Sequence, residues 1–120
     1  MNPVEFAFTS TRKSFLIALC ATAAIFSTAA VAGDNVYSLV IKDHRFQQSE
    51  LTVPAGKKIK LSVENQDPTA EEFESHDLNR EKVIAGNSTA SIFVGPLAPG
   101  RYRFFGEFNE KTAQGVIVAQ

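Results

Sequence analysis

Short runs of alternating apolar and polar residues follow one another along the chain from residue 36 onward. The clearest run is 57–64, where Ile59, Leu61 and Val63 alternate with lysine and serine. An alternation with a period of two predicts a strand that buries one face. Further strands are predicted at residues 36–41, 51–53, 71–75, 81–85, 88–94, 102–105 and 116–119.

The spacing of these runs indicates an all-β domain. Turns rich in Gly, Pro and Asn separate seven or eight short strands, and no segment has a convincing helical pattern. Such a series is typical of an antiparallel β-sandwich. In the run 71–75 we expect Phe73 to point inward, with Glu72 and Glu74 pointing outward.

The first 32 residues have the composition of a signal peptide. Arg12 and Lys13 precede an apolar stretch at 15–31, and Ala30-Val31-Ala32 forms a small-x-small cleavage site. A transmembrane anchor is the rival interpretation, but it needs about 20 strongly apolar residues, and this stretch is rich in Ala, Ser and Thr. We therefore expect an exported chain with a signal peptide at 1–32 and a single domain at 33–120.

Charge and cysteine content exclude several classes of function for residues 33–120. This part has ten basic and twelve acidic residues and no basic stripe, so nucleic acid is not an expected partner. The only cysteine is Cys20 in the leader, so the domain can form neither a disulfide nor a thiolate site. Ser75, His76 and Asp77 are consecutive and would alternate in direction along a strand, so they cannot form a hydrolase triad.

Four segments together resemble a known family. They are FQQSELTVPAGKKIKLSVEN, EEFESHDL, VIAGNSTASIFVGPLAPGRYRFFGEF and GVIVAQ, and in order and spacing the chain resembles the cupredoxin-like domains of bacterial periplasmic iron-uptake systems. The resemblance implies a Greek-key β-sandwich of the cupredoxin type and a periplasmic location. It also implies a bound copper or iron ion, and as partners a periplasmic iron-binding protein and a membrane iron permease.

The chain departs from that family at the copper ligands. The family's last loop supplies a Cys at about the position of Gly106, a His near Asn109 and often a Met shortly before Gly115. None of these ligands is present here. The only Cys is Cys20, the only Met is Met1, and the loop has no His. A type 1 blue copper centre needs one thiolate and two imidazoles, so this kind of centre is excluded.

Carboxylates and imidazoles remain as candidate ligands. The resemblance places Glu72 at the first copper histidine, and Glu107 adjoins the cysteine position. We predict a metal site from His44, Glu72, Glu74, His76 and Glu107, since oxygen and imidazole donors suit iron, manganese and copper(II). The simpler alternatives are a solvated strand edge for Glu71, Glu72 and Glu74, and a pairing of Glu107 with Arg101 or Arg103.

Two functions follow from these predictions. The first is a periplasmic metal-binding protein that assists ferrous iron uptake or oxidation beside an iron permease; a ferroxidase-type activity stays open, and hydrolysis is excluded. The alternative is a metal-free β-sandwich that docks onto a periplasmic or membrane partner. An exposed Phe105 or Phe108 would favour the alternative, because exposed apolar surface often marks an interface.

Overall fold

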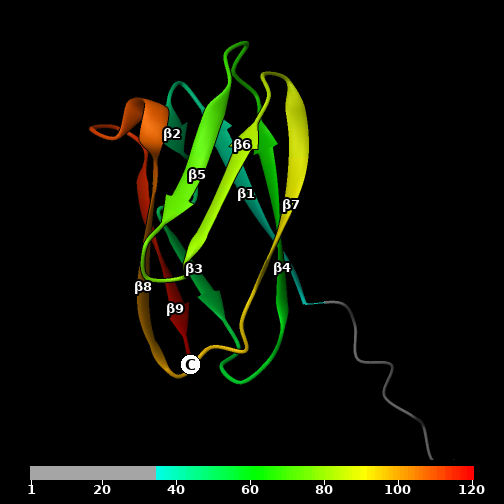
Figure 1. Ribbon diagram of the computed structural model, residues 1–120, viewed down its shortest axis with the longest axis vertical. Coiled ribbons are helices and arrows are strands. Elements are labelled where there is room, and N and C mark those ends of the chain that lie inside the picture. Colours follow the sequence, from blue (N-terminus) through cyan, green and yellow to red (C-terminus); the bar gives the residue numbers. More distant parts are fainter. Residues whose placement is uncertain (1–34) are drawn as a thin grey trace, which may run out of the picture. The chain divides into compact units, whose positions relative to one another are not determined.

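The computed structural model describes residues 35–120, so the predicted signal peptide lies outside the described residues. The described part is a sandwich of two sheets, with strand orders β2-β1-β4-β7 and β3-β9-β8-β5-β6 (Figure 1). The predicted all-β sandwich is confirmed. Its elements are β1 (Val36–Lys42), β2 (Arg45–Phe46), β3 (Glu50–Val53), β4 (Ile59–Asn65), β5 (Glu71–Ser75), β6 (Arg80–Ile84), β7 (Ser88–Val94), β8 (Gly100–Gly106), the 3-10 turn η1 (Glu107–Asn109) and β9 (Gln114–Ala119).

Two strand pairs differ from the antiparallel arrangement that the sequence predicts. β1 pairs with β4 in parallel, and β3 pairs with β9 in parallel, while the other pairs are antiparallel. The reason is the path of the chain. β3 belongs to the second sheet, so the chain leaves the first sheet after β2 and returns to it at β4, running in the direction of β1.

Alternating apolar residues from both sheets form the core. Ile59, Leu61 and Val63 on β4 are at most 1% exposed, as their spacing predicts. Phe73 and Phe104 stack with their ring centres 5.3 Å apart, and the rings of Phe46 and Phe104 are nearly perpendicular with centres 4.9 Å apart. Among the described residues 35–120, the strands pair with one another and the buried side chains form one core, so we expect this domain to fold without the residues before it.

The sequence patterns do not predict two short elements, β2 and η1. The hairpin between β1 and β2 turns at Asp43 and His44, whose φ values are 54° and 56°, as a two-residue hairpin turn requires. β2 itself has only two residues, which is too short for a visible alternation. The other missed element is η1, a single turn after β8. Within residues 35–120 no helix has the length and apolar character needed to cross a membrane.

Candidate metal site and the closed interior position

Glu71 is a buried carboxylate at the start of β5. Its residue is 1% exposed, and its side chain faces the core side of the sheet, as that of Phe73 does. The carboxylate accepts hydrogen bonds from the backbone N–H of Glu72 at 2.9 Å and of Phe108 at 3.0 Å. It also accepts one from the Asn109 side-chain amide at 2.6 Å. These donors replace the water that the carboxylate loses on burial.

The loop positions that the resemblance assigns to copper ligands converge on this carboxylate. A Cβ atom on Gly106 would lie 2.7 Å from Cδ of Glu71 and 2.8 Å from Cβ of Ala113. Asn109 stands at the expected histidine position and bonds directly to Glu71. A type 1 copper ion does not fit these residues, because the space holds a carboxylate and its donors, and neither a thiolate nor an imidazole of residues 35–120 points into it.

The placement of Glu72 at the first histidine position is wrong. Phe73 does point inward, as predicted, but strand alternation then turns Glu72 outward and Glu71 inward. The inward carboxylate is therefore Glu71, for which the acidic pattern of the sequence predicts only a solvated strand edge. The signal for it was available: a residue two positions before an inward phenylalanine on a strand shares its face.

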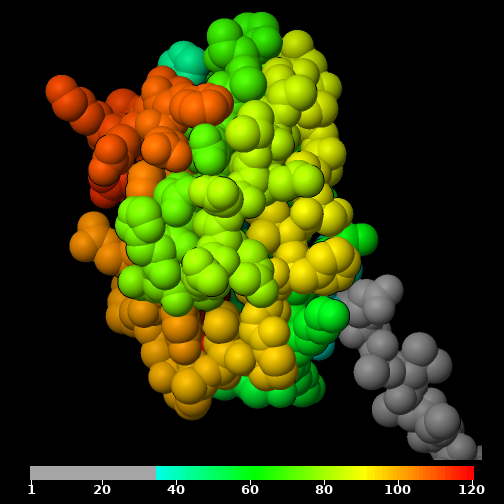
Figure 2. Space-filling view, viewed as in Figure 1, coloured from blue at the N-terminus to red at the C-terminus, as the bar shows by residue number. Residues whose placement is uncertain are grey.

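On the outer face of the same sheet, three predicted ligands come together. Glu72, Glu74 and Glu107 each offer an oxygen, and these oxygens lie within 4.8 Å of one another. β5 carries the first two, and η1 brings Glu107 beside them; η1 (orange) lies next to β5 (green) in Figure 2. We call Glu72, Glu74 and Glu107 the carboxylate cluster. Glu81 on β6 adds a fourth acid, directly opposite Glu74 in register.

Burial and neighbouring negative charges act together on the Glu72 carboxyl. Partial burial raises the pKa of the Glu72 carboxyl above its ordinary value, and the negative charges of Glu107, Glu81 and Glu74 raise this pKa further. A hydrogen bond between the carboxyls of Glu72 and Glu107 acts in the same direction. A cation bound among these groups would relieve the repulsion.

Glu107 has no basic partner among the described residues. Arg101 forms its ion pair with Glu50, at 3.3 Å, and neither arginine of β8 pairs with Glu107 in residues 35–120. The alternative prediction for Glu107, a pairing with Arg101 or Arg103, therefore does not apply to the described structure.

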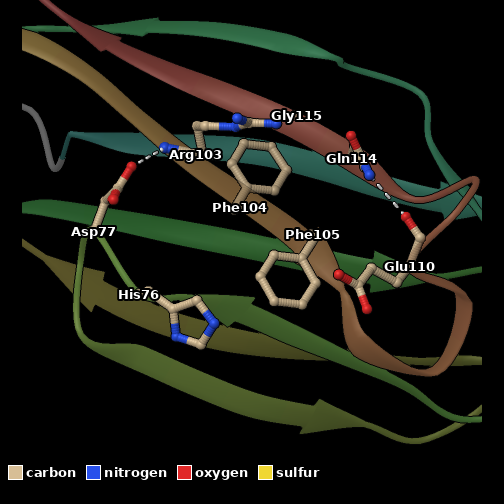
Figure 3. A pocket seen from close by; sticks show the side chains of 8 residues that line it. All are labelled: His76, Asp77, Arg103, Phe104, Phe105, Glu110, Gln114 and Gly115. Atoms are coloured by element: carbon tan, nitrogen blue, oxygen red, sulfur yellow. Dashed lines mark hydrogen bonds between the residues drawn. The ribbon is translucent and has the colours of Figure 1, made fainter.

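His76 borders the carboxylate cluster. Its Nδ1 lies 3.3 Å from Oε1 of Glu74, and its imidazole is largely exposed. The ring packs at 5.5 Å from that of Phe105, and both line a hollow of about 300 Å³ that Glu110 and Arg103 also border (Figure 3). The imidazole can therefore serve as a neighbouring nitrogen donor, and its ligation of a metal stays a prediction.

His44 is engaged elsewhere. Its Nδ1 lies 3.6 Å from Oδ2 of Asp67, and its carbonyl accepts a hydrogen bond from Thr112. Asp67 also accepts hydrogen bonds from the backbone N–H groups of Asp43 and His44. The hydrogen bond from His44 is the main cause that lowers the pKa of Asp67. His44 thus fastens the β1–β2 turn, and the structure does not bring it into the carboxylate cluster.

Comparisons with known proteins agree with this architecture. An uncharacterized protein of Rickettsia prowazekii (strain Madrid E) is 46% identical over 87 residues, which are 71% of this chain and 70% of that protein. Among solved structures, auracyanin A, a "blue" copper protein from Chloroflexus aurantiacus, superposes with a TM-score of 0.63 at 15% identity. This match covers 73% of this chain and all of that one.

A further match is a heme-copper terminal oxidase dimer, with a TM-score of 0.61 at 17% identity. It covers 73% of this chain, which spans 66% of the matched oxidase chain. At such identities these likenesses concern the fold alone. Residues 15–119 match the family described as the cupredoxin-like domain. The two sheets, the strand order and this match lead to one conclusion: the chain belongs to the cupredoxin-like domain family.

Proposed function

We propose that this protein binds an iron or copper(II) ion through the carboxylate cluster on its outer face and assists ferrous iron uptake or oxidation in the periplasm. The observation that carries the proposal is the convergence of oxygens from Glu72, Glu74 and Glu107 within 4.8 Å. Partial burial raises the pKa of Glu72, and the negative charges of Glu107, Glu81 and Glu74 raise this pKa further, so the metal-free arrangement is electrostatically unfavourable. A cation removes that cost.

The donor set favours particular ions. Carboxylate oxygens prefer hard cations, and an imidazole such as that of His76 is a suitable additional ligand for iron or copper(II). Negatively charged carboxylate ligands stabilise Fe(III) more than Fe(II), so an iron held here would pass an electron to an external acceptor, such as a redox partner protein, more readily than iron in water does. The proposed partners, a periplasmic iron-binding protein and a membrane iron permease, would deliver ferrous ion or receive the ferric product.

Calorimetric titration of the domain 33–120 tests the proposal. We expect binding of copper(II) and of anaerobic ferrous ion, and a loss of at least about tenfold in affinity in Glu72→Gln/Glu107→Gln, since each charge contributes strongly in a clustered site. The matched control is Glu50→Gln/Glu110→Gln, which removes the same charge from outside the cluster and should bind as the wild type does. Equal loss in both variants would contradict the proposal.

A second candidate function is docking onto a protein partner. Phe108 on η1 is 53% exposed. Its backbone N–H donates a hydrogen bond to Glu71, so the position of this large apolar side chain at the surface is fixed. Buried surface around an aromatic anchor often dominates an interface. In this case the η1 end of the sandwich would act as the contact.

Growth under iron limitation separates the two candidates. A strain that lacks this protein is complemented with Glu72→Gln/Glu107→Gln or with Phe108→Ser. The metal-binding function predicts that the first variant fails and the second restores growth. The docking function predicts the reverse. If both variants restore growth, both functions are contradicted.

A further inference from the structure

The outer face of the four-stranded sheet carries an exposed phenylalanine surrounded by cations. Phe93 on β7 is 52% exposed. The Nζ atoms of Lys58 and Lys60 lie 5.5 and 6.0 Å from the centre of its ring. From β6, which lies beside β7 (Figure 1), Nε of Arg80 donates a hydrogen bond to the Phe93 carbonyl.

The sheet register extends this group to β1. Val36 pairs with Lys60, and Lys60 pairs with Phe93, so the three residues form one row across β1, β4 and β7. Val36 is 46% exposed. We call Val36, Lys58, Lys60, Arg80 and Phe93 the basic aromatic patch. It presents apolar surface and positive charge together.

The positive charges of this patch are not neutralised within the described part of the chain. The ion pairs found among residues 35–120 involve His44, His76 and Arg101, and none involves Lys58, Lys60 or Arg80. Among the strand residues that the structure describes, alternation places a single acid on the outer face of this sheet, Glu64, four residues from Lys60 along β4. The carboxylate cluster lies on the outer face of the other sheet.

The chain enters the domain beside the patch. The backbone N–H of Lys60 donates a hydrogen bond to the carbonyl of Asn35, the first described residue. In the sequence, the apolar stretch 15–31 ends four residues earlier. The apolar stretch therefore lies close in sequence to the edge of the domain that carries the patch.

We propose that the basic aromatic patch docks the domain on an anionic phospholipid surface. Lysine and arginine near such a surface each strengthen binding about fivefold, because each contributes about 1 kcal/mol. Phenylalanine, tryptophan and leucine side chains beside basic residues can enter the boundary between headgroups and acyl chains. Phe93 thus enters the headgroup layer while Lys58 and Lys60 contact phosphates. This site is independent of the carboxylate cluster.

Vesicle sedimentation tests the proposal with the domain 33–120. The wild type should bind phosphatidylcholine vesicles that contain phosphatidylglycerol and should not bind phosphatidylcholine alone. Lys58→Gln/Lys60→Gln should weaken binding about 25-fold, the product of two fivefold losses. The matched control, Lys42→Gln/Lys111→Gln, has the same net charge as Lys58→Gln/Lys60→Gln, but its changes lie outside the patch. It should bind the vesicles as the wild type does. Equal losses in both variants, or no binding to the anionic vesicles, would overturn the proposal.

A fluorescent variant provides a second, direct readout. The chain contains no tryptophan, so Phe93→Trp introduces a single reporter at an exposed position that tolerates an aromatic ring. Its emission should shift to the blue on addition of phosphatidylglycerol vesicles. An unchanged emission, or a shift that appears on raising the protein concentration without lipid, would overturn the proposal, and the latter would identify a second copy of the chain as the occupant.

Discussion

The side-chain amide of Asn109 donates a 2.6 Å hydrogen bond to the buried carboxylate of Glu71. Asn109 stands where the resemblance places a histidine ligand, and Glu71 lies against the same loop at Gly106. The two residues thus fill this interior position with a hydrogen bond between two side chains of the same domain. The contact fastens η1 to β5, the two elements that carry the carboxylate cluster on the outer face.

Removal of the buried carboxylate should destabilise the domain strongly. Glu71→Ala leaves the donors at Phe108 and Asn109 without their acceptor and opens a cavity, so we expect the free energy of unfolding to fall by about 3 kcal/mol or more. Urea denaturation followed by circular dichroism measures this change. Glu72→Ala is the matched control, since its side chain lies on the outer face, and it should change stability far less. A similar stability of the two variants would contradict the role assigned to Glu71.

Gly106 and Glu71 should be coupled in stability. A methyl group on Gly106 would lie 2.7 Å from Cδ of Glu71, so Gly106→Ala should cost about 1–3 kcal/mol through overpacking. In the Glu71→Ala background the same substitution meets more space and should cost less. The difference is the interaction energy of a double-mutant cycle. Additive costs would show that Gly106 is not required by the buried carboxylate.

Asp67 should link stability to acid pH. The hydrogen bond from the His44 backbone lowers the pKa of Asp67 below 3.8, so its ionised form favours the folded state. This contribution is fully present above about pH 4 and is lost as the pH falls through the lower, folded-state pKa. Asp67→Asn should therefore be less stable than the wild type at pH 7, with a difference that shrinks below pH 3.8. Thermal melts across this pH range measure the difference, and a constant gap would contradict the assignment.

Glu72 should behave in the opposite way. Its pKa is raised above 4.5, so the folded metal-free state holds the proton more tightly than the unfolded chain, and ionisation of Glu72 opposes folding. Glu72→Gln should raise the melting temperature of the metal-free domain at pH 7. The gain should vanish below pH 4.5, where the wild-type carboxyl is protonated. A lower melting temperature at pH 7 would show that the cluster is not repulsive.

The sequence predicts the sandwich well because each strand has a visible period of two. Ile59, Leu61 and Val63 lie inward as their alternation requires. The parallel pairing of β1 with β4 could not be predicted in this way, because alternation is the same in both directions and the pairing depends on where the chain changes sheets. β2 is too short to show any period.

The candidate site was predicted in part. The carboxylates of Glu72, Glu74 and Glu107 do converge, although they come from β5 and η1, and η1 itself had no sequence signal. The inward direction of Glu71 follows from its alternation with Phe73, but its hydrogen bonding could not be predicted, because the sequence does not show which donors a buried glutamate will meet. Two of the donors that Glu71 meets come from residues 37 and 38 positions away.

The most direct test of the central claim is to locate the metal. Crystals of the domain 33–120 soaked with manganese(II), a hard ion that carboxylates bind, give an anomalous difference map that marks the ion. We predict a peak between Glu72 and Glu107 on the outer face of the sheet, and none beside Glu71. A peak at the interior position, among Glu71, Gly106 and Asn109, would contradict the account.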